Sequence, residues 1–446
     1  MRGLADAQGR LEIFTPVWNK RKIKVIAKDQ GISLSGITFR SSRLTALEFL
    51  IVNLGTRIFE KNSKKKNHHD HTIILLKRHL LSLSSILIPV GLLLLFKFSG
   101  IYSGIFFTLF TLLSYPIYRI LRNLIIRKLV TKIIDDQKEM LISQCNQTDF
   151  IWIAPSPHQD LISKLRNKVI LIVPDLVHVE YPFAFSEDLS QADPELKNLV
   201  SEFKSTISVA ARVITYSSHV KFKQVLPLGT HSEDQICVVP NANTRQFKDI
   251  FESETSAIAL ENKNYFFYPT QIRPYKNLEN LVFALYLLNL KRLDMGKSPV
   301  KLFLTSEESQ LDSIQNLLRI FELEDLVKAT GKLSGTQMSE FYKGAIAGVS
   351  PSWHEGGFFF FQISEAWDSN TPCIFSNTSA NRELLPEGSL AYTFDPGNVQ
   401  EIMERMEFVI LNHDEVLRLQ KIELADVFQR SWKQVGLEII EVSLQL

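Results

Sequence analysis

Two basic residues in the second half of the sequence are placed where a phosphate group could be bound. Arg273 and Lys276 stand three positions apart in "FFYPTQIRPYKNLENLVFAL", after a strand-like run that ends at Tyr268 and before a helical pattern that begins at Leu278. Two cations at a helix start, aided by backbone N–H groups and the helix dipole, form a site for a diphosphate. The alternative is a solvated pair of surface cations, because exposed charges are common.

A second stretch, "SPSWHEGGFFFFQISEAW", places two acids on either side of two glycines and four phenylalanines. A carboxylate such as that of Glu365 offers acceptor lone pairs to two adjacent hydroxyls. Backbone N–H groups around Gly356, Gly357 and Phe358 can approach hydroxyls or phosphate closely, since glycine has no Cβ. For Glu355 and Glu365 alike, the alternative is a solvated or helix-capping acid.

The elements that must position these residues alternate between short apolar strands and helices. Strand-like runs include "DFIWIAP", "KVILIVP", "ARVITY" and "QICVVPN", followed later by "YFFYPT", "VKLFLTS", "AIAGVSP" and "TPCIFSN". Such alternation predicts α/β architecture with parallel sheets and right-handed crossovers. A polar break near residues 247–263 separates two series of elements. We therefore expect two Rossmann-like, doubly wound domains that face each other across a cleft.

The expected boundaries are residues 1–255 for the N-terminal, acceptor-side domain and 256–427 for the C-terminal domain. A final helix over 428–446, which carries Trp432, is expected to cross back to the N-terminal domain. Ligands of such sheets bind beyond the carboxyl ends of the strands. Both stretches described above lie in loops of that kind.

One segment of the N-terminal half departs from soluble composition. The runs Leu80–Phe96 and Phe98–Tyr118 contain no charged residue, and only Lys97 lies between them. Each run is close to the ~20 residues that span a bilayer as a helix, so we predict a membrane-associated helical hairpin within about residues 73–132. Its flanks are basic, as two cytoplasmic ends would be. The alternatives are long buried helices of a soluble core or an amphipathic pair lying in the interface; for 121–140, a helix on an anionic surface and one packed on the protein both remain open.

The composition of the chain argues against a nucleic-acid partner, against sites built on cysteines and against export. The chain of 446 residues carries 50 Lys plus Arg against 48 Asp plus Glu, so its overall charge does not point to a nucleic-acid partner. The three cysteines are far apart with no CxxC pair, which argues against a zinc site or a disulfide framework and fits a reducing compartment. The first residues lack an apolar core of signal-peptide length, so export is not expected.

Four segments together resemble a known family. They are "FFYPTQIRPYKNLENLVFAL", "ATGKLSGTQMSEFYKGAIAGVSPSWHEGG", "ISEAWDSNTPCIFSNTSANRELL" and "FQRSWKQVGLEII". In order and spacing they resemble the nucleotide-sugar domain of retaining GT-B glycosyltransferases of family 4. The N-terminal half resembles this family less, through "VPDLVHVEYPFAF", "ARVITYSSHVK" and "ICVVPNANT".

The resemblance implies roles for particular residues. Arg273 and Lys276 would hold the donor diphosphate and stabilise the leaving group, replacing the charge of a metal that a DxD motif would otherwise bind. Glu355 would approach the donor sugar near the reacting carbon, and Glu365 would accept hydrogen bonds from the ribose hydroxyls. Glu365 follows Glu355 by ten positions, two more than in relatives.

Further roles carry over to two loops. Thr378, Ser379 and Ala380 would contact the donor phosphates through backbone N–H groups; the alternative is an ordinary N-cap by Ser379 or Asn381 for a helix over 382–385. On the acceptor side the candidates are Asp175 and His178, with His158 as a further histidine, against the alternative of surface residues without a role.

These observations lead to one functional hypothesis. We expect a membrane-associated glycosyltransferase that moves a hexose-type sugar, with retention of configuration, from a nucleoside diphosphate sugar to a lipid-linked or glycan acceptor in polysaccharide or glycolipid assembly. It would need no metal and no cofactor, and would act at the cytoplasmic face of the membrane, on the inner leaflet. The alternatives are a catalytically silent GT-B scaffold and a membrane-anchored interaction protein in a glycan-assembly complex.

Overall fold

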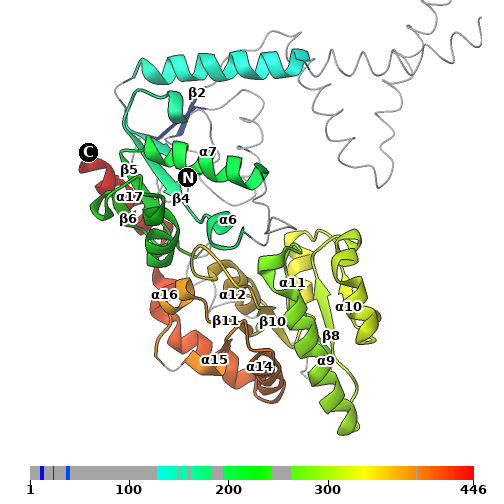
Figure 1. The fold of residues 1–446 in the computed structure, drawn as a ribbon. Helices are drawn as coiled ribbons and strands as arrows, with labels where there is room; N and C mark the ends of the chain where they lie inside the picture. The colour runs from blue at the N-terminus through cyan, green and yellow to red at the C-terminus, as the bar shows by residue number, and fades with distance from the viewer. Residues whose placement is uncertain are drawn as a thin grey trace, which may run out of the picture. The chain divides into compact units, whose positions relative to one another are not determined.

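The computed structural model describes residues 11–14, 24, 37–40, 128–148, 150–157, 162–182, 194–243, 263–387 and 389–446 (Figure 1). The described residues from 145 to 446 belong to one compact unit, and those from 128 to 144 belong to a second one. Two short strands, β1 (Leu11–Phe14) and β2 (Ile37–Arg40), pair in a sheet of their own. The two larger sheets both lie in the unit that ends at residue 446.

The N-terminal α/β half, meaning the described residues from 150 to 243, is built on a four-stranded parallel sheet. Its strands are β3 (Trp152–Ala154), β4 (Val169–Val173), β5 (Arg212–Thr215) and β6 (Ile236–Val238), in that spatial order. All residues of β4 are buried. A parallel strand covered on both faces requires such a continuous apolar run.

Side chains of β4 alternate between two apolar layers, as the period of a strand dictates. Val169, Leu171 and Val173 pack with residues of helix α7 (Pro194–Ser208). Ile170 and Ile172 pack on the other side with residues of the last helix, α17 (Trp432–Leu444). The C-terminal helix therefore covers one face of the N-terminal sheet, beside β5 and β6 (Figure 1).

The C-terminal α/β half, residues 263–429 as far as they are described, contains a six-stranded parallel sheet. The spatial order is β12-β11-β10-β7-β8-β9. The strands are β7 (Tyr265–Tyr268), β8 (Lys301–Leu304), β9 (Val327–Ala329), β10 (Ala347–Ser350), β11 (Cys373–Ser376) and β12 (Thr393–Phe394). From β7 the chain adds β8 and β9 on one side and then β10, β11 and β12 on the other. The order therefore reverses between β7 and β10, and the loops that follow those two strands flank the crevice in which ligands of such sheets bind.

The helices of this half complete its core. They are α9 (Leu278–Asp294), α10 (Gln315–Ile320), α11 (Gly335–Gly344), α12 (Phe360–Trp367), α13 (Ser379–Arg382), α14 (Val399–Leu411), α15 (His413–Glu423) and α16 (Ala425–Gln429). Helices α9 and α14 pack against each other. Buried residues from the strands and most of these helices form one continuous apolar cluster. The prediction of α/β architecture with parallel sheets is confirmed.

The helix over 128–146 is amphipathic. Its buried residues recur at helical spacing, at Val130, Ile133, Gln137, Leu141, Ile142 and Cys145. None of the helices in the described part of the chain is long and apolar enough to cross a lipid bilayer. The predicted hairpin runs, Leu80–Phe96 and Phe98–Tyr118, lie outside the described residues, so their membrane association remains a prediction.

Candidate functional site

The first element of the site is the turn that follows β7. Pro274–Lys276 form a 3-10 turn whose preceding residue, Arg273, is extended, and Asn277 closes the turn in the left-handed region at φ 57°. The side chain of Asn277 donates hydrogen bonds to the carbonyl oxygens of Pro351, at 2.9 Å, and Pro396, at 2.7 Å. These bonds fix the turn to the loops that follow β10 and β12.

Lys276 reaches across the switch point to the loop after β10. Its Nζ lies 2.5 Å from Oε1 of Glu355, and the two side chains are 17% and 25% exposed. Burial works against the charge of Lys276, but the Glu355 carboxylate together with Tyr268 and Tyr275 raises the pKa of the amine overall. The lysine is therefore a fixed positive charge at the carboxyl edge of the sheet.

Arg273 is placed differently. It is exposed, and its guanidinium donates a hydrogen bond to Oε1 of Gln271 at 3.3 Å. The structure thus joins Lys276 to Glu355 at the site, while Arg273 lies on the surface of the same turn.

Gly356 and Gly357 bring the loop after β10 against the N-terminal half. A Cβ on Gly356 would lie 2.1 Å from the carbonyl oxygen of Pro174 and 2.8 Å from Cβ of Asp175. A Cβ on Gly357 would lie 3.2 Å from the side chains of Tyr216 and Asn241. At position 356 the approach of the two backbones therefore excludes any side chain.

A hydroxyl reinforces this contact. Ser217 Oγ donates to the carbonyl oxygen of Gly356 at 3.0 Å, and Tyr181 Oη donates to the carbonyl oxygen of Trp353 at 3.3 Å. Both donors come from the N-terminal half and both acceptors from the loop after β10. The loop is thereby held on both sides of Glu355.

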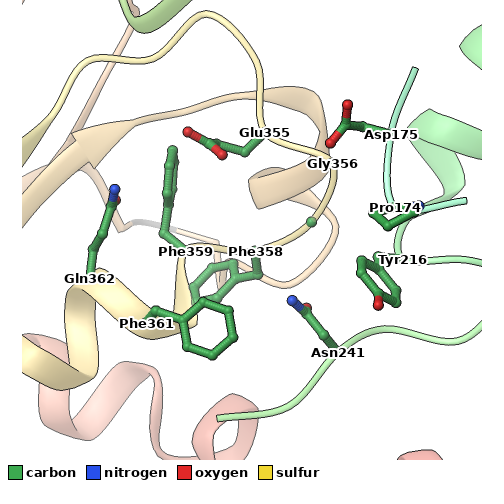
Figure 2. A pocket seen from close by; sticks show the side chains of 11 residues that line it. Pro174, Asp175, Tyr216, Asn241, Glu355, Gly356, Phe358, Phe359, Phe361 and Gln362 are labelled. Carbon is green, nitrogen blue, oxygen red and sulfur yellow. The ribbon is translucent and has the colours of Figure 1, made fainter. Parts of the chain in front are cut away.

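A pocket of about 240 Å³ lies where the two halves meet (Figure 2). Its walls combine carboxylate, amide and aromatic side chains, so it offers hydrogen bonds together with an apolar surface. From the N-terminal half come Pro174, Asp175, Tyr216 and Asn241; from the C-terminal half come Glu355, Gly356, Gly357, Phe358, Phe359, Phe361 and Gln362. The structure therefore brings Asp175, Glu355 and the glycines together, as a shared site requires.

The phenylalanine run differs in burial along its length, although Phe358, Phe359 and Phe361 all line the pocket. Phe358 and Phe359 are buried, with ring centroids 6.1 Å and 5.6 Å from that of Phe375 on β11. Phe361, in the first turn of α12, is 44% exposed and lines the pocket. The run is thus a loop and a helix start, and not a strand.

Glu365 is exposed on α12 and is not among the residues lining the pocket. It follows the pocket residues Phe361 and Gln362 by four and three positions. Residues at these spacings share one face of a helix. Glu365 therefore extends the pocket-lining face of α12 by one turn.

The loop after β11 begins helix α13 earlier than expected. The predicted helix start at 382 and the predicted caps Ser379 and Asn381 are wrong, because Thr378 is the N-cap and its Oγ1 accepts from the Asn381 N–H at 3.3 Å. Ser379 Oγ accepts from the Arg382 guanidinium at 3.1 Å, and Ala380 is buried. The side chains of Thr378 and Ser379 thus make hydrogen bonds within this loop.

His178 is not brought to the pocket. It lies on the short helix α6 (Val177–Glu180), and its ring centroid is 5.9 Å from that of Phe203 on α7. His158 lies outside the described residues. Of the acceptor-side candidates, the structure places Asp175 alone at the pocket, where its Oδ1 also accepts from the Val177 N–H at 3.2 Å.

Sequence reasoning missed several pocket residues. Tyr216 directly follows β5 and Asn241 stands three positions after the end of β6, in the segments "ARVITYSSHVK" and "ICVVPNANT" that carried the N-terminal resemblance. Their position beyond strand ends was the signal that could have identified them. Gln362 gave no such signal, because its orientation depends on where α12 starts.

The comparisons with known proteins agree with this arrangement. Residues 250–423 match the family model "Glycosyl transferases group 1". A comparison with curated protein sequences found no match.

Among solved structures, the chain resembles HepE from Anabaena in complex with UDP, with a TM-score of 0.52, 15% identity, and coverage of 70% of this chain and 82% of that chain. It resembles sucrose-phosphate synthase from Thermosynechococcus elongatus with a TM-score of 0.52 and 15% identity, over 70% and 78% of the two chains. It also resembles a UDP-forming α,α-trehalose-phosphate synthase from Burkholderia xenovorans, with a TM-score of 0.51 and 12% identity over 70% and 78%. At these identities the likeness is one of fold. Together, the family match over residues 250–423 and the shared two-sheet fold support a glycosyltransferase of the GT-B type.

Proposed function

We propose that this protein is a glycosyltransferase that uses a nucleoside diphosphate sugar as donor. The observation that carries the proposal is the placement of Lys276 and Glu355 at the switch point between β7 and β10, beside a pocket shared by both halves of the fold. The match of residues 250–423 to group 1 glycosyl transferases supports it, as does the fold shared with HepE, which was solved with UDP.

In this proposal Lys276 binds the donor diphosphate and stabilises the charge that develops on it as the sugar leaves. Arg273 lies on the same turn and adds a second cation at its outer edge. Because Glu355 already pairs with Lys276, the diphosphate must share or replace that carboxylate when it binds. Glu355, which lines the pocket, would then be released from Lys276 and would face the sugar.

The remaining residues surround the donor and acceptor. Backbone N–H groups of Gly356, Gly357 and Phe358 would meet sugar hydroxyls, and those of the Thr378–Ala380 loop would meet phosphate oxygens. Glu365 would accept hydrogen bonds from the ribose, one helical turn beyond the pocket. Asp175, from the opposite wall, would contact the acceptor hydroxyl. The closed pocket would exclude water that could hydrolyse the donor.

Finer features of the proposal rest on the family resemblance and on the sequence. Retention of configuration, a hexose-type donor and transfer without a catalytic metal follow from the resemblance. A lipid-linked or glycan acceptor at the cytoplasmic, inner-leaflet face of a membrane follows from the predicted hairpin. The wider role would be polysaccharide or glycolipid assembly.

The test is nucleotide binding by the full chain, measured as thermal shift with UDP, GDP and ADP. A nucleotide that binds the native state alone raises the melting temperature by mass action. We expect one of the three to stabilise the wild type and to lose this effect in Lys276→Met. Lys291→Met is the matched control, since Lys291 also pairs with a glutamate, Glu407, at 2.6 Å in the same half.

Transfer is then measured with the corresponding radiolabelled sugar nucleotide and a membrane lipid extract. Binding without transfer or donor hydrolysis would favour the silent scaffold. No shift with any nucleotide would overturn the proposal.

A further inference from the structure

A group of two histidines and one glutamate lies between the two α/β halves, apart from the residues that the proposed transfer uses. Glu180 is the last residue of α6, and His219 precedes a π-helical segment, Val220–Val225. His354 stands in the loop after β10, directly before Glu355. Two elements of the N-terminal half and one loop of the C-terminal half thus converge on one point.

The side chains of this Glu180–His219–His354 cluster are close enough to share one ion. His219 Nε2 lies 2.9 Å and 2.8 Å from the two carboxylate oxygens of Glu180, and His354 Nδ1 lies 3.7 Å from Oε2. One nitrogen or oxygen atom from each residue lies within 4.8 Å of those from the other two. Ligands of a tetrahedral zinc ion, bound at about 2.0 to 2.2 Å, are roughly 3.4 Å apart. The ligand atoms of the cluster, which all lie within 4.8 Å of one another, are separated by distances of this order.

Gln224 orients the cluster. Its Oε1 accepts from the Leu176 N–H at 2.5 Å, which turns its amide N–H group inward. That group donates to Glu180 Oε2 at 2.7 Å and to His354 Nε2 at 3.1 Å. Nε2 of His354 therefore carries a lone pair and not a proton, which is the form of imidazole that binds a metal.

Burial also suits an ion. The side chains of His354, His219 and Glu180 are 4%, 13% and 23% exposed. Charged groups in such places are normally paired or coordinated, and the partial exposure of Glu180 and His219 leaves an entry path from solvent. The set of two imidazoles and one carboxylate is one that zinc and similar transition metals prefer, whereas Mg²⁺ favours oxygen ligands.

We propose that Glu180, His219 and His354 form a binding site for a divalent transition metal of the zinc type, which fastens the loop after β10 to the N-terminal half. The cation takes the place of the Gln224 N–H at Nε2 of His354 and of the proton that His219 Nε2 holds toward Glu180, which is released to solvent. The Gln224 amide keeps its bond to Glu180 Oε2 and holds that carboxylate in position. Water completes the coordination. The role is structural, so it is compatible with transfer that needs no catalytic metal.

The experiment uses the full chain, first treated with a chelator and dialysed. Zinc content after reconstitution with Zn²⁺ alone is measured by mass spectrometry, and melting temperature is followed as Zn²⁺ or Mg²⁺ is added. We expect about one zinc per chain and a rise in melting temperature with Zn²⁺ that Mg²⁺ does not produce.

Two conservative variants test the ligands. Glu180→Gln and His219→Gln keep hydrogen-bonding capacity, and each should weaken zinc binding by at least about tenfold. His178→Gln is the control, because it changes a histidine on the same helix α6 that packs beside Phe203. Melting curves without metal check that every variant folds.

The proposal is overturned if the wild type takes up no zinc, if Mg²⁺ stabilises it equally, or if both ligand variants bind zinc as the control does. The cluster would then be a hydrogen-bonded network only. None of these readouts depends on a sugar nucleotide, so the experiment can refute the metal site without refuting the proposed transferase activity.

Discussion

At the scale of single residues, the chemistry depends on whether the Lys276 amine pairs with Glu355 or with a bound diphosphate. Glu355 lies 2.5 Å from its amine and is also part of the pocket wall. A buried ion pair of this kind contributes little net stability, because desolvation offsets much of the attraction. The ion pair matters for function, because the carboxylate already pairs with the amine that a diphosphate would need as its partner.

The first prediction separates these two residues. Glu355→Gln removes the competing charge, so the nucleotide that stabilises the wild type should bind at least as tightly, while transfer falls by about tenfold or more. Lys276→Met should lose both. Isothermal titration with the nucleotide and initial rates of transfer provide the two measurements. Equal weakening of nucleotide binding in both variants would contradict the division of roles.

A second prediction concerns Gly356. In Gly356→Ala the new methyl group would lie 2.1 Å from the Pro174 carbonyl oxygen, so the loop or the strand end must move. We expect a lower melting temperature and a transfer rate at least about tenfold lower, because displacement of a catalytic loop by about an ångström has effects of this size. Gly335→Ala, at the first residue of α11 with no atom near its Cβ, should leave both unchanged.

At the scale of elements, one buried lysine connects the start of β7 to α15. Lys263 Nζ lies 3.4 Å from His413 Nε2, and burial lowers the pKa of the lysine from 10.5 to about 8 even though Asp414 acts to raise it. The unfolded chain therefore binds more protons at this residue than the folded chain between these two pH values. Stability from this group should rise as pH increases through that window.

The third prediction follows from that sign. The wild type should gain stability relative to Lys263→Met between about pH 8 and pH 10.5, since the methionine variant carries no proton to lose. Urea unfolding of both chains across this range measures the difference, which cancels the titration of groups common to both. A difference that does not increase with pH would show that the pKa of the amine is not lowered in the folded chain.

Helix α17 provides the fourth prediction. Ile439 is buried with Ile170 and Ile172 of β4, whereas Leu437 on the same helix is 47% exposed. Ile439→Asp places an unpaired carboxylate between helix and sheet and should cost about 3 kcal/mol or more. Leu437→Asp should change the free energy of unfolding by about 0.5 kcal/mol or less. Equal effects would mean that α17 does not cover the N-terminal sheet in solution.

At the scale of the whole molecule, two parallel sheets of unequal size share one site. The six-stranded sheet supplies Lys276, Glu355 and the glycine loop, and the four-stranded sheet supplies Asp175, Tyr216 and Asn241. After the six-stranded sheet, the chain returns to the four-stranded sheet through α17. This helix packs on the four-stranded sheet and so stabilises the half that forms the second wall of the pocket. Such two-part sites allow binding energy to be coupled to closure.

The last prediction concerns membrane attachment, which rests on the sequence. Deletion of Leu80–Tyr118 from the full chain should move the protein from the membrane fraction to the supernatant, because the uncharged runs are removed together. Fractionation by ultracentrifugation measures this, and a retained nucleotide-dependent rise in melting temperature confirms that the variant is folded. A deletion variant that sediments with membranes would refute the hairpin as the anchor.

The sequence by itself determined what is local. The alternation of apolar runs and helical patterns gave strands β3 to β6 and most of β7 to β12, because strand and helix periods are set by backbone geometry. Position after a strand end singled out Lys276 and Gly356, whereas Glu355 and Asp175 were indicated by the family resemblance.

Tertiary structure alone decided which distant residues meet. Lys276 and Glu355 are 79 positions apart, and their pairing depends on β7 and β10 being neighbours in the sheet. The exclusion of a side chain at Gly356, the uneven burial of the phenylalanine run and the convergence of Glu180, His219 and His354 all require the two halves to be packed together. Local sequence patterns do not predict that packing, because it depends on contacts between surfaces that exist only in the complete fold.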